Sequence, residues 1–338
     1  MKKLIAAAFA ACLSLSALAQ MMPDSTFQVV AYWSKGDKIS YQCTDRTVKK
    51  TPDGQEEVQN SSSEVRTFEV IDQTDTTYTL RLTYSDVFSS QLSLGLGADF
   101  FAKLAEQEKV DILTNEFGTI QDYLNVEVML DNLVKGMPLI LDGVLAKYSK
   151  KELKAMNFDR EQWISQFTAM FSNPDVVRAA CNKEVVPLFM YHGTRLDPKE
   201  EYTVENEYSN VLGDQGLTTE MQFWIDQEMS DSVSVVIRSH AEAGNKVLLP
   251  MMLNAALATI RATVPEEQYE EAATAILSQL STDKTKTTFT EDTAILVDLA
   301  SGWPIQYVYD RTISIQMDGE TTDVVNSIEV KYIDPNEP

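Results

Sequence analysis

Two histidines, three cysteines and a short run of glutamates are the residues of this 338-residue chain whose types could do chemistry. Their spacing matches no familiar site, because the sequence contains no His-Glu-x-x-His, no Cys-x-x-Cys and no Gly-x-Ser-x-Gly. Zinc sites, redox pairs and serine hydrolases are normally recognised by those spacings. We therefore predict no catalytic residue, no metal site and no cofactor.

The two histidines are far apart in the sequence. His192 stands in Tyr191-His192-Gly193, at the end of a long helical pattern. A histidine followed by glycine is typical of a helix C-terminus, where it interacts favourably with the helix dipole; a general-base role is the alternative. His240 follows the alternating segment 233–237 and is predicted to lie on a loop.

The densest acidic run consists of Glu200, Glu201, Glu205 and Glu207. On a strand, the last three would share one face. A solvated acidic strand edge is the simpler interpretation of this run. Calcium binding and acid/base catalysis by paired carboxylates are the alternatives.

The first nineteen residues predict where the chain goes. Lys2 and Lys3 precede an apolar stretch over 4–15, and Ala17-Leu18-Ala19 forms a small-x-small cleavage site before Gln20. This is the pattern of a secretory signal peptide, and the apolar run is shorter than the ~20 residues of a membrane anchor. We expect an exported, soluble protein that does not span a membrane and lies in the periplasm or outside the cell.

Two cysteines, Cys43 and Cys181, remain after removal of the predicted signal peptide. In an oxidising compartment they could form one disulfide. Two separate buried thiols are the alternative, because sequence alone does not show whether the two residues are close.

The charge of the chain excludes one class of partner. With 51 acidic and 28 basic side chains, the formal net charge is −23. Nucleic acid is not an expected partner, because phosphate binding requires a basic surface. The apolar fraction of 44% is sufficient for a packed core, so the chain is not intrinsically disordered.

The elements that must position these residues are read from hydrophobic periodicity. Strand patterns alternate with helical ones, and Asn173-Pro174 is a typical helix start. We expect strands within 27–86, helix over 98–109, a hairpin over 111–123, helices over 124–190, strands within 202–238, helices over 246–262 and from about 263, and strands at 294–299, 305–315 and 327–333.

The two β-rich regions resemble each other. Ile71-Asp72-Gln73 and Ile225-Asp226-Gln227 end corresponding strands, and each is followed by a strand, a helix and a hairpin. We predict an α+β fold of two similar halves, each a curved antiparallel sheet with helices on one side, over 20–197 and 198–338. Coincidence is the alternative, since alternating strands look alike.

Several short motifs carry a family resemblance. With the leader, Thr114-Asn115-Glu116-Phe117-Gly118, Asn173-Pro174 and Tyr191-His192-Gly193 resemble an uncharacterised family of secreted proteins from Bacteroidota. The resemblance implies export, and it brings no catalytic residue to this chain.

Three functions remain open. The first is a non-catalytic protein that binds a lipid or other apolar molecule between sheet and helices, lined by Met129, Met137, Met251 and Met252, although these residues could equally fill a solid core. The second is an envelope protein that interacts with a protein or glycan, with Trp303 and Tyr307 stacking on sugars rather than packing. The third is a carboxylate-based hydrolase.

Overall fold

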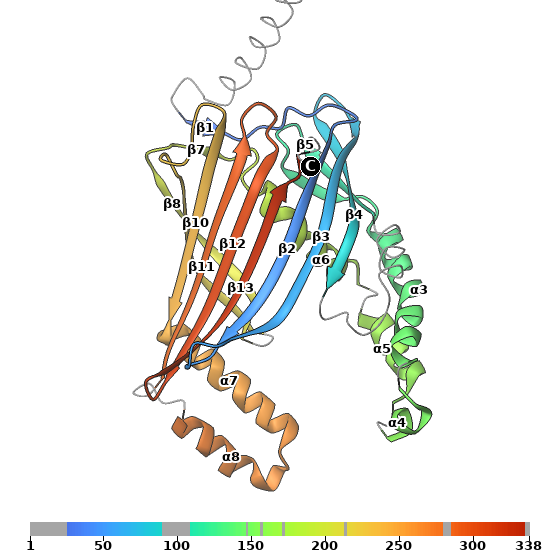
Figure 1. Ribbon diagram of the computed structural model, residues 1–338, viewed down its shortest axis with the longest axis vertical. Coiled ribbons are helices and arrows are strands. Elements are labelled where there is room, and N and C mark those ends of the chain that lie inside the picture. The colour runs from blue at the N-terminus through green and yellow to red at the C-terminus, as the bar shows by residue number, and fades with distance from the viewer. Residues whose placement is uncertain are drawn as a thin grey trace, which may run out of the picture.

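The computed structural model describes residues 26–89, 109–146, 148–155, 158–170, 173–212, 215–279 and 285–334. Its main element is an eleven-stranded antiparallel sheet, with edge strands β6 and β8 (Figure 1). The strands, in spatial order, are β6 (Ile120–Tyr123), β5 (Lys109–Asn115), β4 (Thr77–Ser89), β3 (Glu56–Gln73), β2 (Lys38–Lys50), β13 (Glu320–Tyr332), β12 (Pro304–Met317), β11 (Thr285–Asp298), β10 (Ser234–Gly244), β9 (Gln215–Ile225) and β8 (Glu201–Leu212).

Two runs of sequential strands make up this sheet. In β2 to β6 and again in β8 to β13, each strand pairs with the next along the chain. The runs meet where β2 pairs with β13, so that Cys43 lies opposite Val330. The sheet therefore brings the first long strand of the chain beside the last.

Six helices interrupt the described strands. Four lie between β6 and β7, namely α3 (Val126–Leu145), α4 (Lys150–Ala155), α5 (Arg160–Met170) and α6 (Pro174–Phe189). The other two, α7 (Asn245–Thr263) and α8 (Glu266–Gln279), form a hairpin between β10 and β11 that projects from the lower end of the sheet (Figure 1). The start of α6 is as predicted, because the Asn173 side chain accepts a 3.0 Å hydrogen bond from the Asp175 amide.

The face of the sheet that packs against α6 is called the inner face below. Phe68 of β3 and Phe189 of α6 are both buried, with ring centroids 5.4 Å apart. In β2, Ile39, Tyr41 and Cys43 are buried while the residues between them are more exposed, which is the alternation expected of a sheet covered on one face.

A short N-terminal segment, residues 27–33, crosses the upper end of the sheet. Its strand β1 (Phe27–Gln28) pairs with β7 (Arg195–Leu196). The Ala31 amide donates to the Phe117 carbonyl in the β5–β6 turn, and the Tyr32 amide donates to the Ser301 carbonyl in the β11–β12 turn, each at 3.0 Å. The segment thus ties the two hairpin turns together.

The α+β class and the curved antiparallel sheet agree with the sequence prediction, but the sheet is one continuous layer. The likeness of the halves and the boundary at 197/198 stay predictions. The leader and most of the helix expected over 98–109 lie outside the described residues, and Lys109 begins β5. Within the described ranges, no helix is both long and apolar enough to cross a membrane.

Candidate functional site

Aromatic side chains seal the upper end of the inner face. Trp33 stacks on Trp303 at 4.2 Å between ring centroids, and its ring also lies 5.3 Å from Tyr78 and 5.8 Å from Phe189. All four side chains are buried, and within the described part of the chain the Trp33 indole nitrogen has no hydrogen-bond partner. Trp303 was a candidate for stacking on sugars; it packs in the core instead, and so does Tyr307.

His192 belongs to this sealed region and is not arranged as a general base. Its backbone amide donates to the Phe189 carbonyl at the end of α6, and its Nε2 lies 2.8 Å from the Gly302 carbonyl oxygen. Complete burial lowers the pKa of His192 to about 4, although the carbonyls of Gly302 and Phe189 oppose that shift. The backbone follows the predicted helix end, but the ring is neutral at pH 7, so the expected charge–dipole interaction is absent.

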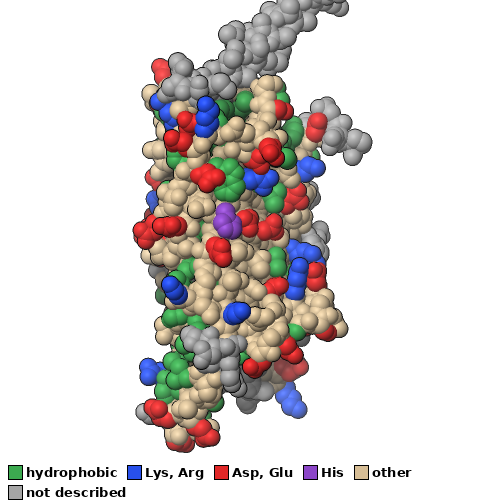
Figure 2. Space-filling view, turned by 90° about the vertical axis from the view of Figure 1, so that its left-hand side faces the viewer, with side chains coloured by type: hydrophobic (Ala, Val, Ile, Leu, Met, Phe, Trp, Pro, Cys, Tyr) green, Lys and Arg blue, Asp and Glu red, His purple; other side chains and the backbone are tan. Residues whose placement is uncertain are grey.

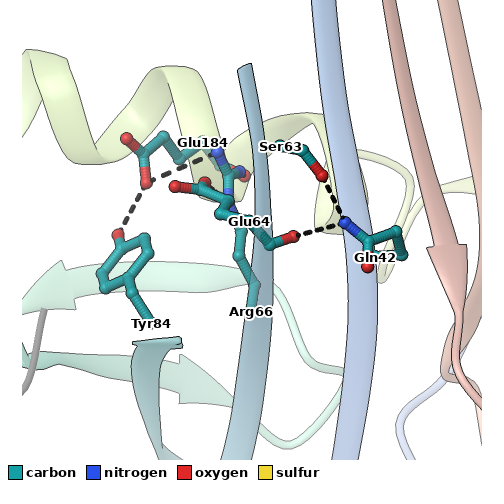
Figure 3. A network of polar contacts seen from close by, with 6 residues as sticks. All are labelled: Gln42, Ser63, Glu64, Arg66, Tyr84 and Glu184. Atoms are coloured by element: carbon teal, nitrogen blue, oxygen red, sulfur yellow. Dashed lines mark hydrogen bonds and ion pairs between the residues drawn. The ribbon is translucent and has the colours of Figure 1, made fainter. Parts of the chain in front are cut away.

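Below the aromatic residues, a polar network joins α6 to β3 and β4 (Figure 3). Arg66 Nε donates to Glu64 Oε1 at 2.6 Å, and Arg66 Nη1 donates to the Glu184 carbonyl at 3.3 Å. The Tyr84 hydroxyl donates to Glu184 Oε2 at 2.6 Å. Burial, with the nearby Glu184 charge, raises the pKa of Tyr84 well above its usual value, so Tyr84 stays a donor. The network fixes α6 over the sheet.

Further down the inner face, polar residues form a transverse row. Asn60 of β3 lies opposite Thr47 of β2, Thr47 opposite Asn326 of β13, and Asn326 opposite Arg311 of β12, which faces Glu291 of β11. Because directly paired residues point to the same face, these side chains cross the sheet at one level.

The end of this row on β12 and β11 is an ion pair between Arg311 and Glu291. Arg311 Nε and Nη2 donate to Glu291 Oε2 at 2.9 and 2.7 Å, and the Tyr309 hydroxyl donates to the same oxygen at 3.0 Å. The guanidinium also lies over the rings of Tyr208 and Phe289, 5.7 and 5.5 Å from their centroids. These contacts satisfy the buried Glu291 charge within the protein.

Below this row, the inner face of β11 is buried at Phe289, Thr287 and Thr285, whereas that of β12 and β13 is partly exposed. Every residue of β12 from Arg311 to Met317 is partly buried. The same is true of every residue of β13 from Thr321 to Ile328. Registry with Arg311 and Asn326 places Ile313, Ile315 and Val324 on the inner face. We call these three side chains the lower inner strip. Ile313 packs against the main core, so the strip continues the core toward solvent.

Cys43 and Cys181 are separate. Cys43 of β2 and Cys181 of α6 are both buried thiols, with no disulfide between them. Burial raises the pKa of the Cys43 thiol to about 12, so it is protonated at neutral pH. Both side chains fill the core under the sheet, which was the alternative to the bridge.

The four methionines do not line one common site. Met129 and Met137 lie on α3, which contacts α5, α6 and β5, whereas Met251 and Met252 lie on α7, which contacts α8 and strands β8 to β11. Met251 is buried in the core, and the other three are partly buried. In α7, which covers the helix predicted over 246–262, Val247 is 42% exposed, because the helix hairpin projects beyond the sheet.

The acidic run lies on the outer face of an edge strand. Glu201, Glu205 and Glu207 of β8 are exposed, and Glu205 faces Glu220 of β9. His240 was expected on a loop; it lies within β10, where Nδ1 is 2.8 Å from Asp292 Oδ1. Acidic side chains are spread over the face of the molecule shown in Figure 2. Within the described part of the chain, no three His, Cys, Asp or Glu residues are arranged to hold a metal ion.

Comparison with known proteins adds little to this geometry. No protein-family model and no curated protein matches the chain. One solved structure, described as "Lipid-protein interactions in lipovitellin", is 11% identical over 89% of this chain, with a TM-score of 0.37. The chain corresponds to only 25% of that protein. A likeness this low carries no argument about fold or function.

Sequence reasoning missed the inner-face polar residues. Asp45, Asn60, Arg66, Asn326 and Arg311 come from four strands that are scattered along the chain. Alternation within each strand assigns a residue to a face, but only the registry between strands shows that these side chains meet. No local motif marks them.

Proposed function

We propose that the protein is exported and binds an apolar or amphipathic ligand on the inner face of its sheet. The observation that carries the proposal is the lower inner strip, an apolar surface that is continuous with the core and partly exposed in the middle of the sheet. Apolar surface lined by few polar groups is the usual setting of a small-molecule site. Export is supported by the leader pattern of the first nineteen residues.

Two measurements test this function. The purified protein is extracted with organic solvent and the extract is analysed by mass spectrometry, while a fluorescent long-chain probe is titrated into the delipidated protein. We expect an extractable apolar molecule or saturable probe binding. A protein that carries no such molecule and binds no probe contradicts the proposal.

Matched variants locate the bound probe. Ile315→Asp places a charge on the inner face, whereas Gln316→Asp places the same charge at the next residue of β12, on the outer face. We expect probe binding to weaken in the first variant only, with both variants folded by circular dichroism. Equal probe affinity in the two variants would exclude the lower inner strip.

A further inference from the structure

A compact group of polar side chains lies at the centre of the inner face, directly above the lower inner strip. It consists of Asp45 and Thr47 of β2, Asn60 and Ser62 of β3, and Asn326 of β13, and is called the central polar cluster below. Asp45 pairs with Ser62, and Thr47 pairs with both Asn60 and Asn326. All five residues are partly buried.

The hydrogen bonds within the cluster both use the Asn326 amide as the donor. Asn326 Nδ2 donates to Asp45 Oδ1 at 2.8 Å and to Thr47 Oγ1 at 3.1 Å. Asn60 Oδ1 is buried and has no hydrogen-bond partner among the described residues. A buried carbonyl oxygen without a donor is costly, so a native protein normally supplies one from water or a ligand.

The two arginines near the cluster are already paired. Arg66 is bound by Glu64 and Arg311 by Glu291. Lys49 lies on the same face, next to Val324 in the register of β2 and β13. Asp45 adds a further carboxylate, and its only direct partner among the contacts above is the neutral amide of Asn326. A ligand that brings a hydrogen-bond donor therefore suits the cluster better than one that brings another carboxylate.

We propose that the central polar cluster binds the polar end of an amphipathic ligand, that this end is a hydroxyl or an ammonium group, and that the apolar chain lies along the lower inner strip. The inference rests on the proposed function and adds the chemistry of the head group. Asn60 Oδ1 and the Asp45 carboxylate accept the ligand's donors, while Ile313, Ile315 and Val324 contact its chain.

A chain-matched series of probes tests the head group. Dodecanol, dodecylammonium and dodecanoate are competed against the fluorescent long-chain probe at pH 7 and at concentrations below micelle formation. We expect the alcohol and the ammonium to bind at least about tenfold more tightly than the carboxylate, a difference typical of one lost polar contact. Dodecanoate that binds as tightly as dodecanol would overturn the proposal.

Variants then test the residues. Asn60→Ala should weaken dodecanol binding by about tenfold, and Asp45→Asn should weaken dodecylammonium more than dodecanol. Asp310→Asn makes the same change as Asp45→Asn but on the outer face of β12, where Asp310 accepts a hydrogen bond from Ser327, and should leave every affinity unchanged. All variants are checked for native circular dichroism.

The outcomes separate the two proposals. If the fluorescent probe binds but Asn60→Ala and Asp45→Asn alter no affinity, the head-group site is overturned and ligand binding stands. If the wild-type protein binds neither the fluorescent probe nor any dodecyl compound, both proposals fail.

Discussion

The upper and lower ends of one sheet differ in how their inner face is covered. Near the upper end of β11, Ile295 and Val297 are at most 1% exposed, whereas Ile313 and Ile315 toward the lower end of β12 are partly exposed. All four are β-branched apolar residues in alternating strands. The difference therefore lies in the cover. The upper end packs against α6 and the N-terminal segment. Toward the lower end, β11 is still buried, at Phe289 and Thr287, where α7 contacts it, whereas β12 is partly exposed.

The upper cover is assembled from distant parts of the chain. Residues 27–33 lie between the turns at Gly118 and Gly302, and both glycines have positive φ, at 91° and 75°. A Cβ on Gly118 would meet the His192 ring at 2.7 Å, and one on Gly302 would meet the Val30 carbonyl oxygen at 2.2 Å. Both turns can approach the segment this closely only because they carry glycine.

The largest effect expected at the upper end comes from Gly302→Ala. The new methyl group would overlap the Val30 backbone, which cannot move without detaching the N-terminal segment. We expect a loss of on the order of 4–5 kcal/mol in the free energy of unfolding, or failure to fold. Urea denaturation followed by circular dichroism measures it.

Gly319→Ala is the matched control at the lower end. Gly319 also has a positive φ, of 88°, in the β12–β13 turn, but a Cβ there would meet nothing within 4 Å. Only backbone strain remains, for which we expect a loss of about 1 kcal/mol. Equal losses in the two variants would show that the Gly302 contact does not seal the upper end.

Trp33→Ala should have the next largest effect. Trp33 is 2% exposed and stacks on Trp303, so its removal leaves a cavity in the aromatic cluster and costs about 3 kcal/mol of unfolding free energy. Tyr32→Ala, at the neighbouring and 40% exposed position, should cost less than about 1 kcal/mol. Similar urea midpoints for the two variants would contradict the burial of this segment.

The upper end should also make the protein sensitive to acid through His192. Its pKa is about 4 in the folded protein and near 6.5 when exposed, so the unfolded chain binds the proton first as the pH falls. The stabilising effect of a neutral His192 is full above pH 6.5 and is lost progressively toward pH 4, by about 3 kcal/mol in total. Urea denaturation from pH 7 to pH 4 measures this loss.

His192→Gln keeps an amide donor toward the Gly302 carbonyl but does not titrate. Carboxylates make the stability of both the wild-type protein and the variant fall in acid. The two proteins are therefore compared by the slope of unfolding free energy against pH. We expect unfolding free energy to fall less steeply with decreasing pH in the variant, between pH 6.5 and pH 4. Identical slopes would mean that His192 is not buried as a neutral ring.

Local features of the fold were predictable, and its long-range pairings were not. The strand patterns within 27–86 predicted most of β4, and Asn173-Pro174 predicted the start of α6. His240 was misplaced because β10 extends to Gly244 by pairing with β11, which lies beyond the intervening helices. The burial of Trp303 depends on Trp33, and no sequence pattern links two residues so far apart.

The same chemical change at both ends gives the smallest and most selective prediction. Ile→Thr keeps the β-branched shape that suits a strand and replaces a methyl group by a hydroxyl. At Ile295, which is 1% exposed, the hydroxyl enters a packed core, and we expect a loss of about 2 kcal/mol with unchanged probe affinity once folded. At Ile315 the hydroxyl stays in reach of water, so the loss should be below about 1 kcal/mol.

Probe affinity should nevertheless fall in Ile315→Thr, because the ligand chain would lie against this residue. Urea denaturation and probe titration of both variants measure the two quantities independently. If Ile315→Thr destabilises the protein as strongly as Ile295→Thr and leaves probe binding intact, the two ends are equally covered, and the lower inner strip is not where a ligand binds.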